Sequence, residues 1–492
     1  MTQKAQIRTI ITSLMLVILL GALDQTIISV SLPKMATELE GVDLLAWVVS
    51  GYLIAMAVAT PIYGKLGDIY GRRSVLSSAI VLFLLASVLC ALAPTMPSLV
   101  AARILQGLGG GGLISVAQAT IADVVAPRER GRYQAYISGA FAVASVSGPV
   151  LGGLLTAYLS WRWIFWINLP LGIPALLLTR RALAQLHHPR VKRQVDYLGA
   201  GLLSAGLTAL LLGITRLGQG VPLSEVSNIA LFVGALTFLL IFIVHALRVP
   251  EPIIPLSLFR IRTVVISCLM LFFVLIQLIA LTILIPLQLQ MLTDLGPGGA
   301  AWRIISLSLA IPLGAYIGGK LMSRLGTFKG IQLVGALLVP FALYALSVLN
   351  PVNFFALSVC LSSIGIGLGL QLPTATVAVQ NAVPVRHLGV ATGVSAFSRS
   401  LGSAMGAAVL MALLLLFLTQ GIGSTDLVAA DVIRILVSGN PDFAQSPTMT
   451  SLREVSALAF GRVYFWQAML AVIPVLLCLC LKNEVLGTKV PD

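Results

Sequence analysis

Long apolar runs separated by short polar loops cover almost the whole chain. A membrane-spanning helix needs about 20 mainly apolar residues, and windows of this length predict fourteen spans. Their expected ranges are 10–33, 45–63, 75–93, 98–121, 135–158, 163–180, 197–217, 228–247, 264–289, 302–322, 331–349, 354–374, 391–418 and 463–481. We therefore expect an all-α, multi-pass integral membrane protein, and the even number of spans places both termini on one side.

Basic residues are distributed unevenly between the two sets of loops. If the termini are cytoplasmic, the cytoplasmic loops and tails hold 22 of the 31 Lys and Arg residues, and the opposite loops hold seven. The remaining two, Arg103 and Arg399, lie within spans. Short cytoplasmic loops are normally enriched in Lys and Arg, so we expect both termini in the cytoplasm.

Composition excludes several classes of protein. The chain is 58% hydrophobic and only 10% charged, whereas a soluble domain carries about 25% charged residues. The net charge of +14 comes from basic residues scattered over short loops, which indicates membrane topology and not nucleic-acid binding. The five cysteines lie inside apolar runs without metal-site spacing. We expect no disulfide, metal or cofactor, and no enzyme, since neither a nucleophile–base set nor a Walker-type phosphate loop occurs.

A weak internal repeat suggests how the chain is organised. The segment 319–326 follows the tenth span and resembles the segment 64–71, with Ser323 in the position of Asp68. Repeated halves are typical of transporters, although two glycine-rich loops can also be similar by chance. The repeat predicts a six-helix half at 1–181, two inserted helices with basic linkers at 182–260, and a second six-helix half at 261–492. The last half contains an extracytoplasmic loop at about 419–462, either a lid or a solvated connection.

The segment 64–73 places four charges between the second and third spans. Its glycines permit a tight turn and close helix contacts. The Asp68 carboxylate can bind a helix N-terminus or an arginine, which would form a latch that a conformational change breaks. The alternative is a set of screened surface pairs. The residues expected at this cytoplasmic gate are Gly64, Asp68, Gly71, Arg72, Arg73, Asp123 and Arg132.

Asp24 lies inside the first predicted span. A carboxylate in a membrane helix is costly, so it normally faces a cavity or a partner. Burial favours its protonated form and a nearby cation favours its charged form, so we expect it to exchange a proton against a cationic substrate. Arg103 in the fourth span lies at a similar depth, which predicts a direct or water-bridged pair. The alternatives are a structural ion pair and an arginine that binds backbone carbonyls.

Other polar residues in the spans are candidates for the substrate pathway, or else form ordinary hydrogen bonds between helices. These candidates are Gln25, Gln118, Gln277, Gln288 and Arg399. In the fifth span, Gly148, Pro149, Gly152 and Gly153 combine a helix-bending proline with small residues. Such a helix either flexes between two states or is simply kinked.

These segments resemble the major facilitator superfamily, and within it the fourteen-span drug:proton antiporters of the QacA/EmrB type. The segment 64–73 is similar to the superfamily's Gly-x-Leu-Ala-Asp-x-x-Gly-Arg-Arg/Lys loop, with Gly67 in place of alanine. The segment 23–33 is similar to the antiporters' Leu-Asp-x-Thr-Ile/Val-x-Asn-x-Ala-Leu-Pro motif, with Ser29 and Ser31 as departures. Further similarities lie in Arg-x-x-Gln-Gly at 103–107, in the exporter motif Gly-Pro-x-x-Gly-Gly at 148–153, and in the tryptophan-rich segment 161–172, which we expect to be structural.

The resemblance implies a proton-coupled multidrug efflux antiporter of the bacterial cytoplasmic (inner) membrane. Asp24 and Arg103 would couple proton entry to the export of lipophilic, cationic compounds by alternating access between two six-helix halves. The expected partners are the lipid bilayer, a small lipophilic substrate and protons. We expect a monomer, and the need for a periplasmic adaptor stays open. The alternative is a major facilitator exporter of a lipid, a fatty acid or another native metabolite.

Overall fold

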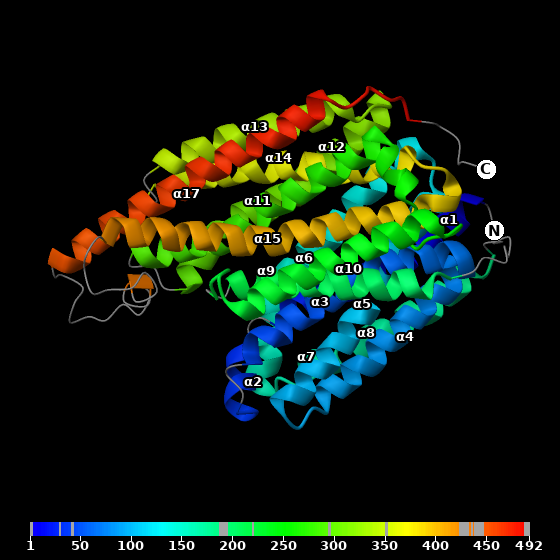
Figure 1. Cartoon of the computed structure of the whole chain (residues 1–492), viewed down its shortest axis with the longest axis horizontal. Helices are drawn as coiled ribbons and strands as arrows, with labels where there is room; N and C mark the ends of the chain where they lie inside the picture. Colours follow the sequence, from blue (N-terminus) through cyan, green and yellow to red (C-terminus); the bar gives the residue numbers. More distant parts are fainter. Residues whose placement is uncertain are drawn as a thin grey trace.

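The computed structural model describes residues 3–28, 31–40, 44–185, 195–218, 221–293, 297–349, 353–422, 432, 433, 436 and 447–486. Helices form almost all of this part of the chain (Figure 1). The long helices are α1 (Gln3–Ile27), α3 (Leu45–Tyr70), α4 (Arg72–Ala91), α5 (Met96–Val124), α6 (Pro127–Tyr158), α8 (Asn168–Ala182), α9 (Tyr197–Gly218), α10 (Val226–Arg248), α11 (Arg262–Leu292), α12 (Pro297–Leu325), α13 (Lys329–Val348), α14 (Phe354–Asn381), α15 (Leu388–Ile422) and α17 (Pro447–Leu479). The short helices are α2 (Leu32–Glu38), α7 (Trp163–Trp166), η2 (Leu183–Gln185), η3 (Leu256–Arg260) and η4 (Val385–His387).

Thirteen helices of the described residues are long and apolar enough to cross a membrane. Each of the fourteen predicted spans overlaps one long helix. The helix α6, which covers the predicted span 135–158, is not among the thirteen. The structure therefore supports a membrane protein with many spans, while the number fourteen stays a prediction.

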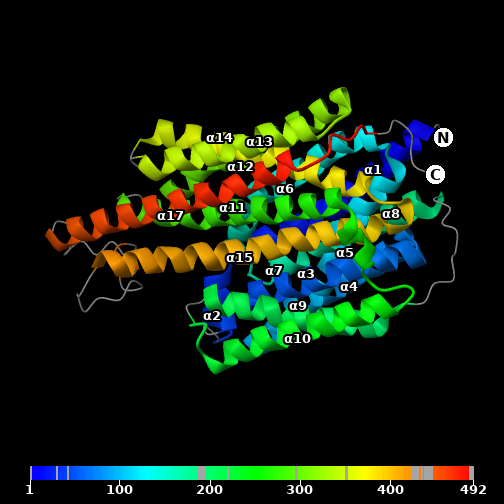
Figure 2. The ribbon, with the colours of Figure 1, turned by 45° about the horizontal axis from the view of Figure 1, so that its top comes forward.

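The helices form two groups that meet along the middle of the bundle (Figures 1 and 2). One group consists of α1, α3, α4, α5, α6 and α8, and the other of α11 to α15 with α17. Across the junction, α3 packs on α15 and α6 packs on α12. The helix α9 packs on α3 and α15, while α10 packs mainly on α9, along one side of the bundle (Figure 2).

Apolar side chains fill the interior of both groups. The largest core cluster joins α11, α13, α14, α15 and α17, and a second joins α1, α4 and α5. A third cluster connects α3, α9, α11 and α15, and so spans the junction. In a bilayer such helices associate through close van der Waals contact, since lipid is as apolar as the side chains. The outward faces remain apolar, as on α10, where Leu236 and Leu247 are exposed.

The helices α15 and α17 run beyond their predicted spans, and they project from the bundle at the end opposite to the chain termini (Figure 1). Residues 419–422 and 447–462 of the predicted loop are therefore helical, and most of 423–446 lies outside the described residues. The two helices bury Leu418, Leu452 and Phe460 against their neighbours. This contact between α15 and α17 stabilises the helical turns that lie beyond the predicted spans. A hydropathy window detects only the part of each helix whose length matches the thickness of the bilayer.

Candidate functional site

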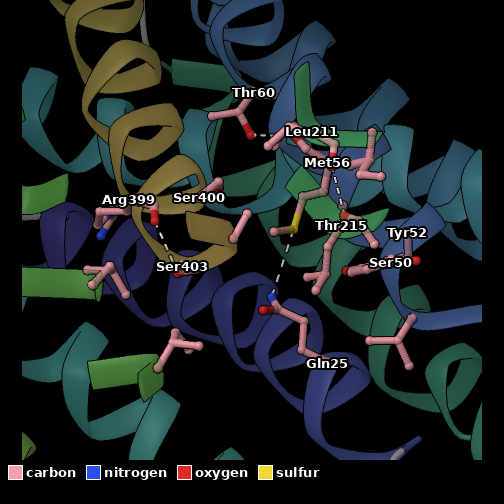
Figure 3. Close-up of a pocket in the computed structure, with 18 of the residues that line it drawn as sticks. Gln25, Ser50, Tyr52, Met56, Thr60, Leu211, Thr215, Arg399, Ser400 and Ser403 are labelled. Atoms are coloured by element: carbon pink, nitrogen blue, oxygen red, sulfur yellow. Dashed lines mark hydrogen bonds between the residues drawn. The ribbon is translucent and has the colours of Figure 1, made fainter. Parts of the chain in front are cut away.

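A cavity of about 730 Å³ lies between the two groups of helices, within the size range of small-molecule sites. Side chains from α1, α3, α5, α6, α9, α11 and α15 line it, and most of them are apolar (Figure 3). Its charged lining residues are Arg103 and Arg399. No carboxylate is found among the described residues that line it.

Asp24 lies on α1, next to the lining residues Gln25 and Thr26, and its side chain is 1% exposed. Its Oδ2 atom accepts a hydrogen bond from Arg103 Nη1 at 2.8 Å. Its Oδ1 atom accepts from Gln106 Nε2 at 2.9 Å and from Asn168 Nδ2 at 3.0 Å. A buried carboxylate with a charged partner and two further donors is compensated for its loss of water.

Arg103 connects Asp24 to the cavity. Its Nε atom donates to the Val48 carbonyl oxygen at 3.2 Å, and its guanidinium lies 4.1 Å from the centre of the Tyr52 ring. Arg103 and Tyr52 both line the cavity, whereas Asp24 does not. A change in the charge of Asp24 therefore alters the electrostatic potential at the cavity wall, because Arg103 belongs to that wall and pairs with Asp24.

Sequence analysis did not single out Ser87, Gln106 or Asn168 as partners at this site. Gln106 follows Arg103 by three residues, a spacing that places both on one face of α5. Asn168 carries no comparable local signal, because its contact with Asp24 depends on how α8 packs against α1. Its Nδ2 atom also donates to Ser87 Oγ at 2.9 Å, so it links α1, α4 and α8.

The glycine-rich motif of α6 packs against α1 beside Asp24. A Cβ atom on Gly148 would overlap Thr26, and one on Gly152 would overlap the Ile27 carbonyl oxygen. The Thr26 hydroxyl donates to the Ala144 carbonyl oxygen at 2.8 Å, which holds the two helices together. Gly153 is half-buried in the same helix, and the side chain of Pro149 lies outside the described residues.

Asp68 and Arg72 form a buried network at the end of the bundle where α1 begins and α17 ends, here called the termini end (Figure 1). Arg72 Nη2 lies 2.6 Å from Asp68 Oδ1, and Arg72 Nε donates to Asp123 Oδ2 at 2.7 Å. The Asp68 carboxylate also accepts from the backbone nitrogens of Gly389 and Val390 at 3.1 and 3.0 Å. These nitrogens open α15, where a carboxylate is favoured by the helix dipole.

The glycines of the segment 64–73 permit the close contact between α3 and α15. Gly71 has a φ of 85°, which lets the chain pass from α3 to α4 in one residue. A Cβ atom on Gly64 would overlap the Gly389 carbonyl oxygen, so α3 and α15 touch through their backbones.

Two of the expected gate residues stay outside this network. Arg73 is exposed, because it follows Arg72 by one residue and points about 100° away around the helix. Arg132 is also exposed and donates to the Tyr136 hydroxyl at 3.1 Å. Arg128, which the sequence did not indicate, donates to the Ser323 and Arg324 carbonyl oxygens at 2.7 and 2.8 Å. It thereby binds the C-terminal end of α12 to α6.

The five pathway candidates divide into two groups. Gln25 and Arg399 line the cavity (Figure 3), and Arg399 Nη2 donates to Gln118 Oε1 at 3.1 Å. Gln277 and Gln288 are buried and instead bind α17. Gln277 and Gln467 each donate to the other's carbonyl oxygen, at 3.3 and 3.2 Å, and Gln288 accepts from the Tyr464 hydroxyl at 3.0 Å. The rotation of α11 about its axis turns both glutamines away from the cavity.

The described residues contain no group of three His, Cys, Asp or Glu side chains that could hold a metal ion. The polar clusters at Asp24 and Asp68 are built from carboxylates, arginines, amides and backbone nitrogens. Such groups can hold a proton or an ion pair.

Comparisons with known proteins identify the family. The model of the Major Facilitator Superfamily matches residues 14–407. The multidrug transporter protein MdtP of Bacillus subtilis (strain 168) is 31% identical over 406 residues, which are 82% of this chain and 75% of that protein. The MFS-type efflux pump MMF1 of Pseudozyma antarctica (strain T-34) is 34% identical over 411 residues, 81% of this chain and 75% of that protein.

The chain spans only part of the length of a further relative. It is 33% identical over 416 residues, 84% of its length, to the uncharacterized MFS-type transporter Rv1877 of Mycobacterium tuberculosis (strain ATCC 25618 / H37Rv), of which it spans 60%. Among solved structures, the human organic anion transporter MFSD10 (TETRAN) has a TM-score of 0.62 at 18% identity, covering 96% of this chain and 99% of that one. The proton:xylose symporter XylE has a TM-score of 0.60 at 16% identity, with 95% of each chain covered.

The two solved structures share the helical fold, and the family match covers most of the chain. Members of this family are transporters and not enzymes. The chain belongs to the major facilitator superfamily.

Proposed function

We propose that the chain is a proton-coupled exporter of lipophilic compounds, of the fourteen-span drug:proton antiporter type. It would work as a monomer by alternating access in a bacterial cytoplasmic membrane, with the termini end in the cytoplasm and no cofactor. The excess of basic residues in the loops at that end supports the orientation. Relatives named as a multidrug transporter and an efflux pump support export. The need for a periplasmic adaptor stays open.

The position of Arg103 between Asp24 and the cavity carries the proposal. A proton that binds Asp24 removes the negative partner of Arg103 and leaves a positive charge at the cavity wall. At about 5 Å and an effective dielectric constant of 20, such a charge repels a bound cation by roughly 3 kcal/mol. Proton binding and cation binding then exclude each other, as antiport requires.

The network at the termini end supplies the second part of the mechanism. Asp68, Arg72 and Asp123 join α3, α4 and α5 to the first turn of α15. We infer that this contact closes the cytoplasmic entrance to the cavity and that it breaks when the protein changes to the inward-facing state. Proton entry supplies the work, since each charge moved through the membrane potential is worth about 2.3 kcal/mol per 100 mV.

One observation favours a second cargo class, namely a lipid, a fatty acid or another native metabolite. Arg399 faces the cavity, and Gln118 is its neutral partner. In the described part of the chain, Arg399 forms no ion pair with a carboxylate. A neutral or anionic cargo would suit this wall better than a cation.

Proton release from purified protein on addition of tetraphenylphosphonium tests the proposal. Wild-type protein should release protons, whereas Asp24→Asn should release none, and Glu129→Gln, at an exposed carboxylate outside both polar clusters, should behave as the wild type. Unchanged release from Asp24→Asn would reject Asp24 as the coupling site. Absence of release with tetraphenylphosphonium, followed by release or transport with laurate, would favour the second cargo class.

A further inference from the structure

The helix α9 belongs to the predicted inserted pair, yet it forms part of the cavity wall. Leu211, Ile214 and Thr215, which lie within two turns of α9, line the cavity together with residues of α3 and α15 (Figure 3). These two helices come from the two different groups of the bundle, and α9 packs on both. The helix therefore covers the junction between the groups at the level of the cavity.

The partner helix α10 has a different environment. It packs mainly on α9, and its outer face exposes large apolar side chains such as Ile229, Leu236 and Leu240. By contrast, Leu211 and Ile214 of α9 are 2% and 7% exposed. The pair thus has an outer helix suited to lipid and an inner helix with one face in the core and the cavity.

The face of α9 that lines the cavity suits the apolar part of a ligand. Leu211 and Ile214 offer only hydrocarbon, and the Thr215 hydroxyl donates to the Leu211 carbonyl oxygen at 2.8 Å. That hydrogen bond satisfies the one strong donor of the Thr215 side chain within its own helix. A cargo therefore needs neither a charge nor a hydrogen-bonding group where it contacts α9. The shape of its apolar part determines whether it fits against this face.

We propose that α9 is a wall of the substrate site and that Leu211, Ile214 and Thr215 determine which lipophilic cargo fits. The inference rests on the proposed export function for its cargo class. The inserted pair then acts in recognition: α10 shields α9 from lipid, and α9 presents an apolar surface to the apolar part of the cargo. The charged part of the cavity lining stays on α5 and α15.

Threonines on the two helices offer a matched test. Thr237 on α10 donates to the Val233 carbonyl oxygen at 2.8 Å, as Thr215 does to Leu211, but it is exposed on the outer face. In a Cys480→Ser background, which removes the exposed cysteine, Thr215→Cys and Thr237→Cys are placed in nanodiscs and labelled with N-ethylmaleimide. We expect Thr215→Cys to react at least tenfold faster, since a thiol reacts as its thiolate and lipid suppresses ionisation. Equal rates would overturn the proposal.

The second arm measures recognition. Thr215→Phe should weaken the binding of tetraphenylphosphonium at least tenfold and that of the smaller benzyltrimethylammonium by less, while Thr237→Phe changes neither. Equal loss for both probes, or the same loss from Thr237→Phe, would overturn the role of α9 in selectivity. Labelling needs no cargo, so a failure of both probes to bind the wild type would reject cation export while the labelling rates still decide whether α9 is a wall.

Discussion

Asp24 is held at the residue scale by side chains from two other helices, and each contact has a separate consequence. Arg103 supplies the compensating charge, while Gln106 and Asn168 supply neutral donors to the other carboxylate oxygen. A buried ion pair is compensated only when its remaining polar atoms also find partners. The two amides therefore stabilise this arrangement together with the arginine.

Asn168 should be distinguishable from a purely structural asparagine. Asn168 and Asn228 are both fully buried, and each donates two hydrogen bonds through Nδ2. Asn168→Ala should lower the stability of the folded protein by about 1–3 kcal/mol, because the buried Asp24 and Ser87 acceptors lose a donor. Asn228→Ala should cost about 1 kcal/mol, since its acceptors, the Val221 and Pro222 carbonyl oxygens, are not buried. Only Asn168→Ala should change the pH dependence of ligand-induced proton release. An identical pH profile in Asn168→Ala and wild type would contradict the role assigned to this contact.

Arg399 should set the charge preference of the cavity. It adds a positive charge to a wall without a carboxylate among its described residues. Arg399→Gln should therefore strengthen tetraphenylphosphonium binding by about 1–3 kcal/mol, as Coulomb's law gives for a charge several ångströms away. Titration of both proteins in nanodiscs measures the change. Arg260→Gln, an exposed arginine outside the cavity, serves as the control. Weaker cation binding in Arg399→Gln would be the contrary result.

At the scale of the element, α6 offers two glycines with opposite expected behaviour. A Cβ on Gly152 meets the backbone of Ile27, whereas a Cβ on Gly139 meets nothing within 4 Å. Gly139→Ala should raise stability by up to about 1 kcal/mol through helix propensity. Gly152→Ala should lower it by roughly 1–3 kcal/mol, since α6 must move away from α1. Thermal unfolding in detergent measures both, and a stabilising Gly152→Ala would show that the close contact of α1 and α6 is not required.

The elements themselves follow from the sequence to different degrees. Every predicted span overlaps a long helix, because an apolar run of sufficient length has few other structures in a bilayer. Asp24 and Arg103 lie at similar depths in the first and fourth predicted spans, which indicated that the two side chains could meet. The structure places them in an ion pair. The rotation of α11 was not predictable, since the same helix could turn Gln277 toward the cavity or toward α17. Packing against neighbouring helices decides this, and a single sequence does not contain that information locally.

The whole molecule has two related contacts at the termini end. Gly71 and Gly326, at equivalent positions of the two sequence repeats, both have positive φ angles. A Cβ on Gly64 would overlap Gly389, and one on Gly319 would overlap Gly131, so α3 meets α15 as α12 meets α6. The charges differ: Asp68 binds backbone nitrogens of α15, whereas Arg128 of α6 binds carbonyl oxygens at the end of α12. Both contacts use helix ends, so both can break as units when the two groups of helices separate.

Neighbouring arginines on α4 allow this closure to be tested. Arg72 is buried between Asp68 and Asp123, while Arg73 is exposed. Arg72→Gln removes the charge that compensates both carboxylates, and breaking such a buried pair costs about 3–5 kcal/mol. The population should therefore shift toward the state in which the termini end is open, and Arg73→Gln should leave it unchanged. Spin-label distances between the termini-end loops 125–126 and 326–328 should lengthen in Arg72→Gln. If the two variants give the same distances, closure does not depend on the buried network, and the Arg128 hydrogen bonds with the backbone contacts of Gly64 with Gly389 and of Gly319 with Gly131 are enough to hold that end together.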